Sequence, residues 1–393
     1  MTSKLSSLCS YVKEKISTQT LSRQNYISTE NMMPNKGGIV GANSLPSVQY
    51  TQQYAKGDVL VSNIRPYFKK IWIAENDGGC SNDVLVFRAI HGCDPTFLYY
   101  VLSSNAFFDY ATATAKGTKM PRGDKAAIMQ YEVSCFDYET QLRIGKLLKC
   151  FDDRIVTNQK INDNLQQQAK ALFKSWFVDF DPFGGVQPSE MQFVPLQDLC
   201  KVVTKGTTPT TLGKPFTTSG INFIKAESIL NNHSIDSCKF AYIDDETNSM
   251  LKRSIINADD IVFTIAGTLG RFALVDESIL PANTNQAVAI IRPDHTKISS
   301  TYLYSFFIGN WHNEYYSKRV QQAVQANLSL TTIKSLPIAL LDKKTMDQYD
   351  KLMCPLFAMM KNNEEENRKL SILRDSLLPK LMSGEIDVSA VQL

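Results

Sequence analysis

Residues 144–176 read IGKLLKCFDDRIVTNQKINDNLQQQAKALFKSW, and this stretch decides the fold class. One set of its positions steps alternately by four and three residues, which is the a/d seam of a coiled coil. These positions hold Ile144, Leu148, Phe151, Ile155, Asn158, Asn162, Leu165, Ala169, Leu172 and Trp176. A helix of about 40 residues extends about 60 Å, which is longer than a small domain. Such a helix needs a partner along its length.

A second seam lies near the other end of the chain. It holds Tyr349, Met353, Leu356, Met360, Asn363, Asn367, Leu370, Arg374, Leu377 and Leu381. Both seams carry two asparagines at equivalent places, and a polar residue in a seam fixes register and partner. We therefore expect the two helices to pair, with Asn158 and Asn162 near Asn363 and Asn367. Two unconnected core helices remain the alternative. Pro355 should kink or restart the second helix.

The rest of the chain repeats once, at a distance of roughly 200 residues, which is far too long for a solenoid unit. The matching segments keep their order and need few gaps. They are 5–9 with 196–200, 57–62 with 259–264, 81–82 with 284–285, 97–99 with 302–304, 128–133 with 333–338, and Leu165 with Leu370. The chain is therefore interpreted as two copies of one module.

Each module combines strands and helices. Short runs rich in β-branched and aromatic residues predict strands, and a run with proline near its start predicts a helix. The predicted strands of the first module are 58–62, 71–74 and 84–87, the predicted helix is 95–102 with its counterpart at 300–307, and 76–79 are predicted turns. We expect an α+β fold with a first module at 1–138, a helix at 139–180, a second module at 190–340 and a helix at 343–385.

Composition limits the function less than this organisation does. The chain is 43% hydrophobic and 21% charged, with a net charge of +3, as in an ordinary soluble protein. Any basic surface must therefore be local. The eight cysteines form no C-x-x-C pair and there are four histidines, so we expect no metal site. The sequence has no apolar signal or membrane-spanning run, which favours a cytoplasmic protein with reduced thiols.

Catalytic signatures are missing. Gly206–Lys214 has the wrong spacing for a P-loop, and Pro215 follows where a magnesium-binding hydroxyl is needed. Gly267–Gly270 is too short for a dinucleotide loop. Of Asp259 and Asp260, only the second has an acidic counterpart in the first module, so we expect a turn before a strand. The chain is not expected to be an enzyme.

Three further segments carry a family resemblance. Leu377–Ile386, Asp260–Arg271 and Gln325–Ser329 resemble, in that order, the end of the C-terminal helix, a strand–glycine loop–strand element and a polar loop of the specificity subunits of type I restriction–modification systems. Each segment is short, but their order and the duplication extend the resemblance over essentially the whole chain. The first module departs from the pattern. Arg65–Phe68 lacks both glycines and Pro121–Asp124 replaces the polar loop, so we expect the loops of the two modules to differ in conformation.

The resemblance implies a division of labour in antiviral defence by a bacterial cell. Each module is then a target recognition domain for one half of a bipartite site in double-stranded DNA. The two helices form an antiparallel coiled coil that sets the spacing and docks two methyltransferase subunits, which restriction and translocase subunits join. S-adenosylmethionine, ATP and Mg²⁺ belong to those partners, and no cofactor, metal or membrane to this chain. The alternatives are a non-catalytic coiled-coil scaffold and a specificity subunit of a related defence system.

Loop residues with basic or amide side chains are the candidate DNA contacts, because phosphates attract lysine and arginine and base edges pair with polar groups. Solvated loop charges remain the alternative for each, and Thr207 and Thr208 are equally suited to capping turns. The candidates are Arg65, Lys69, Lys70, Lys116, Lys119 and Arg122 in the first module, and Lys205, Thr207, Thr208, Arg271, Gln325, Asn327 and Ser329 in the second.

Overall fold

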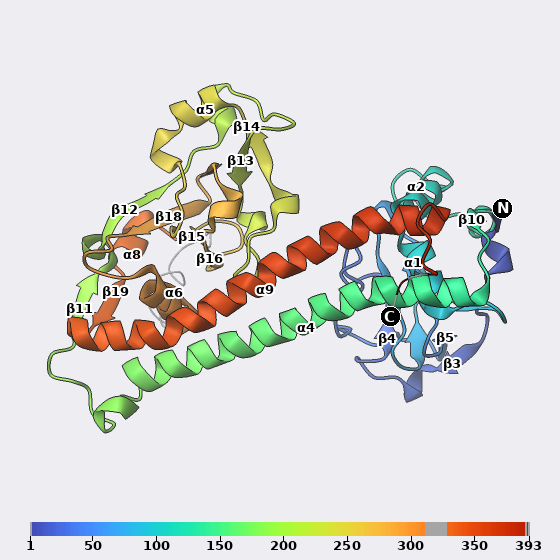
Figure 1. Cartoon of the computed structure of the whole chain (residues 1–393), viewed down its shortest axis with the longest axis horizontal. Helices are drawn as coiled ribbons and strands as arrows, with labels where there is room; N and C mark the ends of the chain where they lie inside the picture. The colour runs from blue at the N-terminus through green and yellow to red at the C-terminus, as the bar shows by residue number, and fades with distance from the viewer. Residues whose placement is uncertain (1, 311–327, 390, 392–393) are drawn as a thin grey trace. The chain divides into compact units, whose positions relative to one another are not determined.

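The computed structural model describes residues 2–310, 328–389 and 391, which form two compact units. Unit 1 consists of residues 1–157 together with 365–393, and unit 2 of residues 158–364. Each unit combines β-sheets with short helices and with part of two long helices, α4 (Tyr138–Phe177) and α9 (Lys343–Ser383), drawn green and red in Figure 1. No helix among the described residues is long and apolar enough to span a bilayer.

Unit 1 contains two four-stranded sheets and one strand pair. The central sheet has the order β2-β9-β6-β7, the second sheet the order β3-β5-β8-β4, and β1 pairs with β10. The strands are β1 (Thr2–Lys4), β2 (Cys9–Tyr11), β3 (Lys15–Ser17), β4 (Tyr26–Ile27), β5 (Tyr50–Tyr54), β6 (Val59–Ser62), β7 (Ile71–Ile73), β8 (Gly78–Cys80), β9 (Val84–Ala89) and β10 (Glu132–Ser134). The short helices are α1 (Pro95–Ser103), α2 (Asn105–Ala113) and α3 (Lys125–Ile128).

Unit 2 repeats this plan. Its central sheet has the order β12-β18-β15-β16, a smaller sheet the order β14-β13-β17, and β11 pairs with β19. The strands are β11 (Gln192–Pro195), β12 (Cys200–Lys205), β13 (Ile221–Ile224), β14 (Ala241–Ile243), β15 (Ile261–Thr264), β16 (Phe272–Leu274), β17 (Ala282–Thr284), β18 (Val288–Pro293) and β19 (Pro337–Leu340). The short helices are α5 (Asp245–Met250), α6 (Ser300–Ile308) and α8 (Leu330–Lys334).

The central strands are buried on both faces, which explains their unbroken apolar sequences. In β6, Val59 and Val61 join the core that includes the helices, while Leu60 faces the core beneath the second sheet. In β15, Ile261 and Phe263 join the helix-side core and Val262 the opposite one. Successive side chains of a strand point to opposite faces, so one short run supplies both cores.

An ion pair between a buried aspartate and a partly exposed arginine ties two central strands together in each unit. The Asp58 carboxylate, just before β6, accepts hydrogen bonds of 2.8 and 2.7 Å from Arg88 on β9. Asp260, just before β15, accepts the same two bonds from Arg292 on β18. The side chains of Asp58 and Asp260 are almost fully buried. The expectation of a simple turn at Asp260 is therefore incomplete, because its carboxylate also forms a bidentate ion pair with arginine, which is a strong type of hydrogen-bonded contact.

The two long helices enter the core of each unit. The core of unit 1 includes Ile144 and Leu148 from α4 and Leu378 and Leu381 from α9. The core of unit 2 includes another set from the same helices, namely Ala169, Phe173, Phe177, Tyr349 and Met353. Every position of both predicted seams is buried or partly buried. The helices therefore pair and also contribute to the core of each module.

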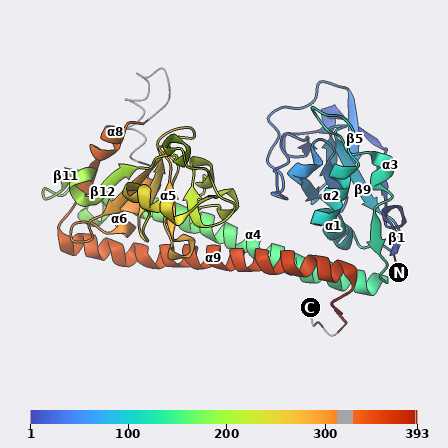
Figure 2. The same ribbon diagram turned by 90° about the horizontal axis from the view of Figure 1, so that it is seen from above.

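Polar contacts set the direction of pairing within each unit. In unit 2 the Asn363 amide donates to Asn162 Oδ1 at 2.8 Å, and Asn162 donates to the Met360 carbonyl at 3.1 Å. In unit 1 Arg154 makes a two-pronged pair with Glu366, with both distances 3.0 Å. In both units residue numbers fall along α9 as they rise along α4, so the helices are antiparallel. Both views show them side by side (Figures 1 and 2).

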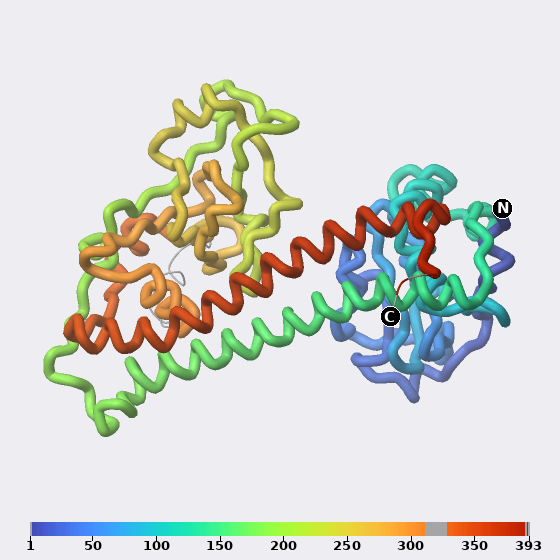
Figure 3. Tube along the Cα trace, viewed as in Figure 1, coloured from blue at the N-terminus to red at the C-terminus, as the bar shows by residue number. Residues whose placement is uncertain are grey.

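A restart of the second helix at Pro355, one of the two effects expected of this residue, is not observed. The helix α9 is continuous from Lys343 to Ser383, and Figure 3 draws it as one coil. Pro355 is exposed, so the carbonyl that loses its helical donor can be solvated. Met353 and Met360 on either side are buried in unit 2, and this packing holds the helix together. The prediction of a restart is wrong.

The predicted turn at Gly78–Gly79 is also wrong, because both glycines lie in β8. A Cβ atom on Gly78 would lie 2.2 Å from the Asn25 carbonyl oxygen and 2.4 Å from the Tyr54 hydroxyl. A Cβ on Gly79 would lie 2.7 Å from a methyl group of Leu21. These glycines serve close packing between strands, one of the recognised reasons for glycine inside a strand.

Replacing Asn162 by leucine should destabilise unit 2 by about 1–3 kcal/mol, because the Asn363 amide loses its partner in a partly buried seam. Replacing Asn162 and Asn363 together by leucine should recover part of the lost stability, since neither polar side chain is then left without its partner. Gln168→Leu is the control, because it removes an exposed hydrogen bond to Asn164 on the same helix. Urea unfolding of the wild type, the single variants Asn162→Leu and Asn363→Leu and the double variant gives the coupling energy, and strictly additive changes would contradict the pairing.

Candidate nucleic-acid interface

Three loops of unit 1 are joined by backbone hydrogen bonds. Segment 65–69 lies in the middle. Its Arg65 N–H donates to the Pro121 carbonyl at 2.8 Å, while Asn35 and Lys36 donate to the Phe68 and Lys69 carbonyls, each at 2.8 Å. These bonds bring segments 33–38, 65–69 and 116–122 together. We call this set of segments the unit 1 loop cluster.

The unit 1 loop cluster gathers most of the basic candidates of the first module. They are Arg65, Lys69, Lys116, Lys119 and Arg122, with Lys36 as an additional member. Two have acidic partners: Lys116 lies 2.5 Å from Asp124, and Arg122 lies 3.0 Å from Asp83. Lys116 and the backbone N–H groups of the following helix lower the pKa of Asp124. The cluster therefore keeps a net positive charge, reduced by two carboxylates.

Lys70 does not belong with the other candidates. Its ammonium donates to the Thr29 carbonyl at 2.6 Å, and burial lowers the pKa of this lysine. Arg271 occupies the corresponding position in unit 2, since Ser62 N–H donates to the Lys70 carbonyl and Thr264 N–H to that of Arg271. The Arg271 guanidinium likewise donates to a loop carbonyl, that of Ile229, at 3.2 Å. Both cations hold a neighbouring loop in place.

The loops containing these residues share a backbone feature that the sequence analysis did not foresee. Arg65 and Lys69 have positive φ values of 49° and 52°, although neither is glycine. Gly267 and Gly270 take the corresponding places in unit 2, with φ values of 78° and 79°. The two loops share this feature and otherwise differ as expected, since residues 66–68 form a short 3-10 turn and residues 266–270 form bends and a turn. Both begin and end in the left-handed region, which costs a non-glycine residue free energy.

Unit 2 brings its own loops together in the same way. Gly206 N–H donates to the Asn285 carbonyl at 3.1 Å, Ile265 N–H to Ala287 at 2.8 Å, and Leu328 N–H to Ile265 at 2.9 Å. A Cβ on Gly206 would lie 1.8 Å from the Thr284 carbonyl oxygen, so this strand end requires glycine. Segments 205–208, 265–271, 285–287 and 328–329 therefore form a unit 2 loop cluster.

The polar candidates of unit 2 are partly engaged in this framework. Thr207 accepts a bond of 3.3 Å from Arg253, and the Thr208 hydroxyl contacts the Gln286 side chain. Ser329 caps α8 by accepting from Thr332 N–H at 3.0 Å. Lys205 is exposed at the end of β12. The remaining candidates, Gln325 and Asn327, lie outside the described residues.

A histidine supports the loop that Arg271 holds. The His233 ring stacks on Phe272 with centroids 4.0 Å apart. Burial lowers the pKa of His233 to about 4, so the ring is neutral at physiological pH. Gln166 on α4 also donates to the Asn232 carbonyl of this loop at 2.8 Å. The loop is thus fixed from three sides.

Sequence reasoning missed four residues of the two loop clusters and Arg253, which donates to Thr207 of the unit 2 loop cluster. The four are Lys36, Tyr67, Phe68 and Gln286. The run Pro34-Asn-Lys-Gly-Gly38 is a strong turn signal and was a usable clue to Lys36. The others depend on contacts between distant segments, which no local pattern reports.

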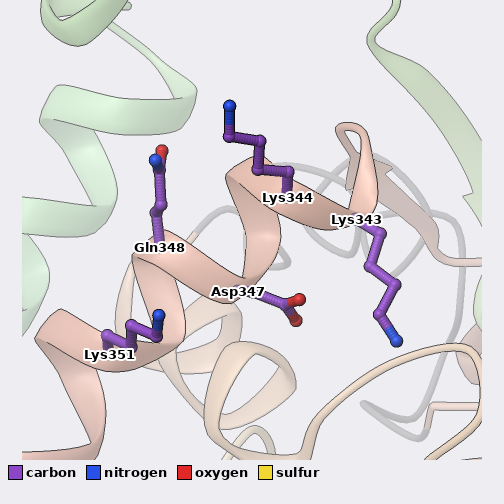
Figure 4. Close-up of a pocket in the computed structure, with 5 residues that line it drawn as sticks. All are labelled: Lys343, Lys344, Asp347, Gln348 and Lys351. Atoms are coloured by element: carbon purple, nitrogen blue, oxygen red, sulfur yellow. The ribbon is translucent and has the colours of Figure 1, made fainter.

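Other places in the described structure have less of the character of a site. Among the described residues, no three histidine, cysteine, aspartate or glutamate side chains are grouped to hold a metal ion. An open hollow at the start of α9 is lined by Lys343, Lys344, Asp347, Gln348 and Lys351. Its side chains extend in different directions (Figure 4), so they do not form a convergent pocket.

Comparison with known proteins identifies a duplicated family domain. The model of the type I restriction modification DNA specificity domain matches residues 2–167 and again residues 188–352. The chain is 25% identical over 437 residues to the type I restriction enzyme HindI specificity subunit of Haemophilus influenzae, covering 92% of this chain and 94% of the relative. It is 23% identical over 350 residues to the MjaIX specificity subunit of Methanocaldococcus jannaschii, covering 85% and 79%.

A solved structure shares the fold. The crystal structure of the S subunit of a type I restriction-modification system from M. genitalium matches with a TM-score of 0.59 and 16% identity, over 97% of this chain and 96% of that one. The two family matches confirm the predicted tandem duplication. The likeness to the solved structure confirms the predicted arrangement of mixed α/β domains with long helices.

If Arg271 and Lys70 hold loops, replacing them should loosen those loops first. Arg271→Gln should speed backbone amide exchange in residues 229–235, and Lys70→Gln should do so in residues 28–32, because each loop loses a bond to its carbonyl. Lys205→Gln removes an exposed charge from unit 2 and is the matched control. Hydrogen–deuterium exchange of the full chain measures all three. Unchanged exchange in both loops would contradict the assignment.

Proposed function

Since the chain belongs to the family of type I restriction–modification DNA specificity domains, its role is DNA-sequence recognition in such a system, and we propose that each unit reads one half of a bipartite DNA target. The observation that carries the proposal is the recurrence of one loop-bearing framework in both units. In each, an ion pair between a buried aspartate and an arginine fixes the strand that leads into the loop cluster. The loops then carry different side chains on the same support.

Two units that recognise different DNA sequences need different loop side chains on the same backbone framework. The strand–loop–strand segment is Arg65-Pro-Tyr-Phe-Lys69 in unit 1 and Gly267-Thr-Leu-Gly270 in unit 2. Base readout depends on which donors and acceptors reach the groove, while phosphate contacts position the protein. Joining two readers in one chain raises the effective concentration of the second half-site once the first is bound.

The helices are proposed to set the half-site spacing and to dock two methyltransferase subunits, which restriction subunits join. Exposed apolar side chains on both helices support a docking role, because charged and polar residues normally dominate such surfaces. They are Val156, Ile161, Leu352, Met359, Ile372 and Leu373. We assign the chemistry, and with it S-adenosylmethionine, ATP and Mg²⁺, to those partners in the cytoplasm, and none of it to this chain.

A non-catalytic scaffold remains the competing function. It accounts for the paired helices but gives no role to the loop clusters. The two proposals differ in one measurable respect, since a scaffold predicts no sequence-dependent DNA binding by either unit.

Exchanging residues 1–138 for those of a relative should change one half of the methylated target and leave the other intact. The donor must keep the residues that pack on Ile144, Leu148, Leu378 and Leu381, because these helix positions lie in the core of unit 1. Methylome sequencing of cells that also carry the partner methyltransferase reads the outcome. A change in both halves, or in neither while methylation persists, would sink the two-reader model.

Inserting seven residues into each helix should lengthen the gap between half-sites and leave both half-sites unchanged. One heptad adds about 10 Å, or about three base-pair steps at 3.4 Å each, and it preserves the seam. The insertions belong between Thr157 and Asn158 and between Glu364 and Glu365, where the two units divide. An insertion near Leu172 is unsuitable, since Phe173 is in the core of unit 2. An unaltered gap in the methylome would refute the spacing role of the helices.

A further inference from the structure

Two adjacent aromatic side chains lie in the open at the middle of the unit 1 loop cluster. The exposed fractions of Tyr67 and Phe68 are 47% and 39%, and their ring centroids are 4.8 Å apart. Tyr67 and Phe68 stand side by side in a short turn, Pro66–Phe68. Neighbouring exposed aromatic rings usually mark a binding surface rather than a neutral one.

The backbone beneath these rings is held rigidly. The turn is bounded by Arg65 and Lys69, both left-handed, and the Phe68 N–H donates to the Arg65 carbonyl at 2.9 Å. Asn35 and Lys36, which bond to the Phe68 and Lys69 carbonyls, are left-handed as well, with φ values of 54° and 60°. Non-glycine residues in this region persist only where the surroundings enforce them, and they cluster at functional sites.

The unit 1 loop cluster that bears the rings is rich in basic residues, which selects the occupant. The Arg65 guanidinium carbon lies 6.0 Å from the Phe68 ring centroid. Within the described residues, Arg65 Nε is buried without a hydrogen-bond partner. The other cations of the unit 1 loop cluster are Lys36, Lys69, Lys116, Lys119 and Arg122. An apolar tip within a basic rim complements a duplex, whose phosphates flank grooves lined by apolar base and sugar surfaces.

We propose that Tyr67 and Phe68 form an aromatic tip that enters a groove of duplex DNA and packs against its bases at the half-site read by unit 1. The proposal deepens the proposed function and rests on it. Arg65 and the lysines of the rim hold the flanking phosphates, and the rings supply an apolar contact that senses how easily the base step opens. Sequence preference at that step then follows from deformability as well as from hydrogen bonds.

The described residues of unit 2 include no such tip at the equivalent loop. Between the two left-handed positions unit 2 has only Thr268 and Leu269 where unit 1 has Pro66, Tyr67 and Phe68, and Leu269 packs against the core of unit 2. The two units therefore contact DNA with different side chains from the same backbone framework. The aromatic contact belongs to the first half-site alone, and this asymmetry makes it testable.

The test uses the full chain in complex with its partner methyltransferase. A duplex that the wild-type complex selects from a random pool is labelled with 2-aminopurine at successive positions. Tyr67→Ala/Phe68→Ala is compared with the conservative variant Tyr67→Phe/Phe68→Tyr and with Tyr50→Ala. Tyr50 lies on β5 of the same unit, and its exposed fraction is 55%, so it is a matched surface aromatic.

The wild-type complex should raise 2-aminopurine fluorescence at one step of the first half-site, because inserted side chains unstack bases. The alanine pair should abolish this signal and lower affinity by about 5-fold to 150-fold, the loss typical of one stacking contact, with the salt dependence unchanged. The conservative pair and Tyr50→Ala should behave as wild type. Arg65→Gln should instead reduce the salt dependence, because phosphate contacts release counterions.

Each alternative has its own result. If the wild-type complex selects no sequence, the proposed function itself fails. If it selects a bipartite sequence and the alanine pair keeps affinity, preference and the fluorescence signal, only the aromatic tip is refuted. If the alanine pair loses the methyltransferase in size-exclusion chromatography while the chain alone still binds DNA with unchanged affinity, the tip is a protein contact and the proposal is overturned.

Discussion

A helix of 40 residues in water needs a partner along its apolar seam, and this constraint organises the whole chain. The two seams satisfy it by pairing antiparallel, and each then continues into a globular core. The β-sheets of a unit are closed on one face by segments of both helices, so neither module has a complete core without them. The asparagines and the Arg154–Glu366 pair add little free energy to this burial but restrict which residues can meet.

The duplicated aspartate–arginine pair explains how the two units support different surfaces on one framework. Each pair anchors the residues before a central strand. Each of these strands leads into a loop whose first and last residues have a left-handed backbone conformation. In unit 2 glycines adopt this conformation freely. In unit 1 arginine and lysine adopt it, and the neighbouring backbone bonds compensate for the cost. Side chains in these loops can therefore vary while the path of the chain is kept.

How much was predictable depended on whether the signal was local. The seams repeat with a period that a short window reveals, and the strands around Val59 and Val84 and the helix at Pro95 stand out as short apolar runs. The roles of Lys70, Arg271 and Ser329 could not be predicted in this way. A hydrogen bond to a distant carbonyl, or a helix cap, leaves no periodic pattern in the sequence. Gly78 and Gly79 carried the usual turn signal but serve a crowded strand. The helix continues past Pro355 for a similar reason, since packing on both sides outweighs one lost backbone bond.

The division of the chain into units also governs the order in which it can fold during synthesis. Unit 2 is a continuous segment, whereas unit 1 consists of an early segment and a late one. The buried Leu378, Leu381 and Val388 of unit 1 are translated only after all of unit 2. The early segment, which carries the exposed aromatic tip, therefore keeps part of its apolar core surface exposed until α9 has been translated. Chaperone binding and aggregation during this interval should depend on the speed of translation through unit 2.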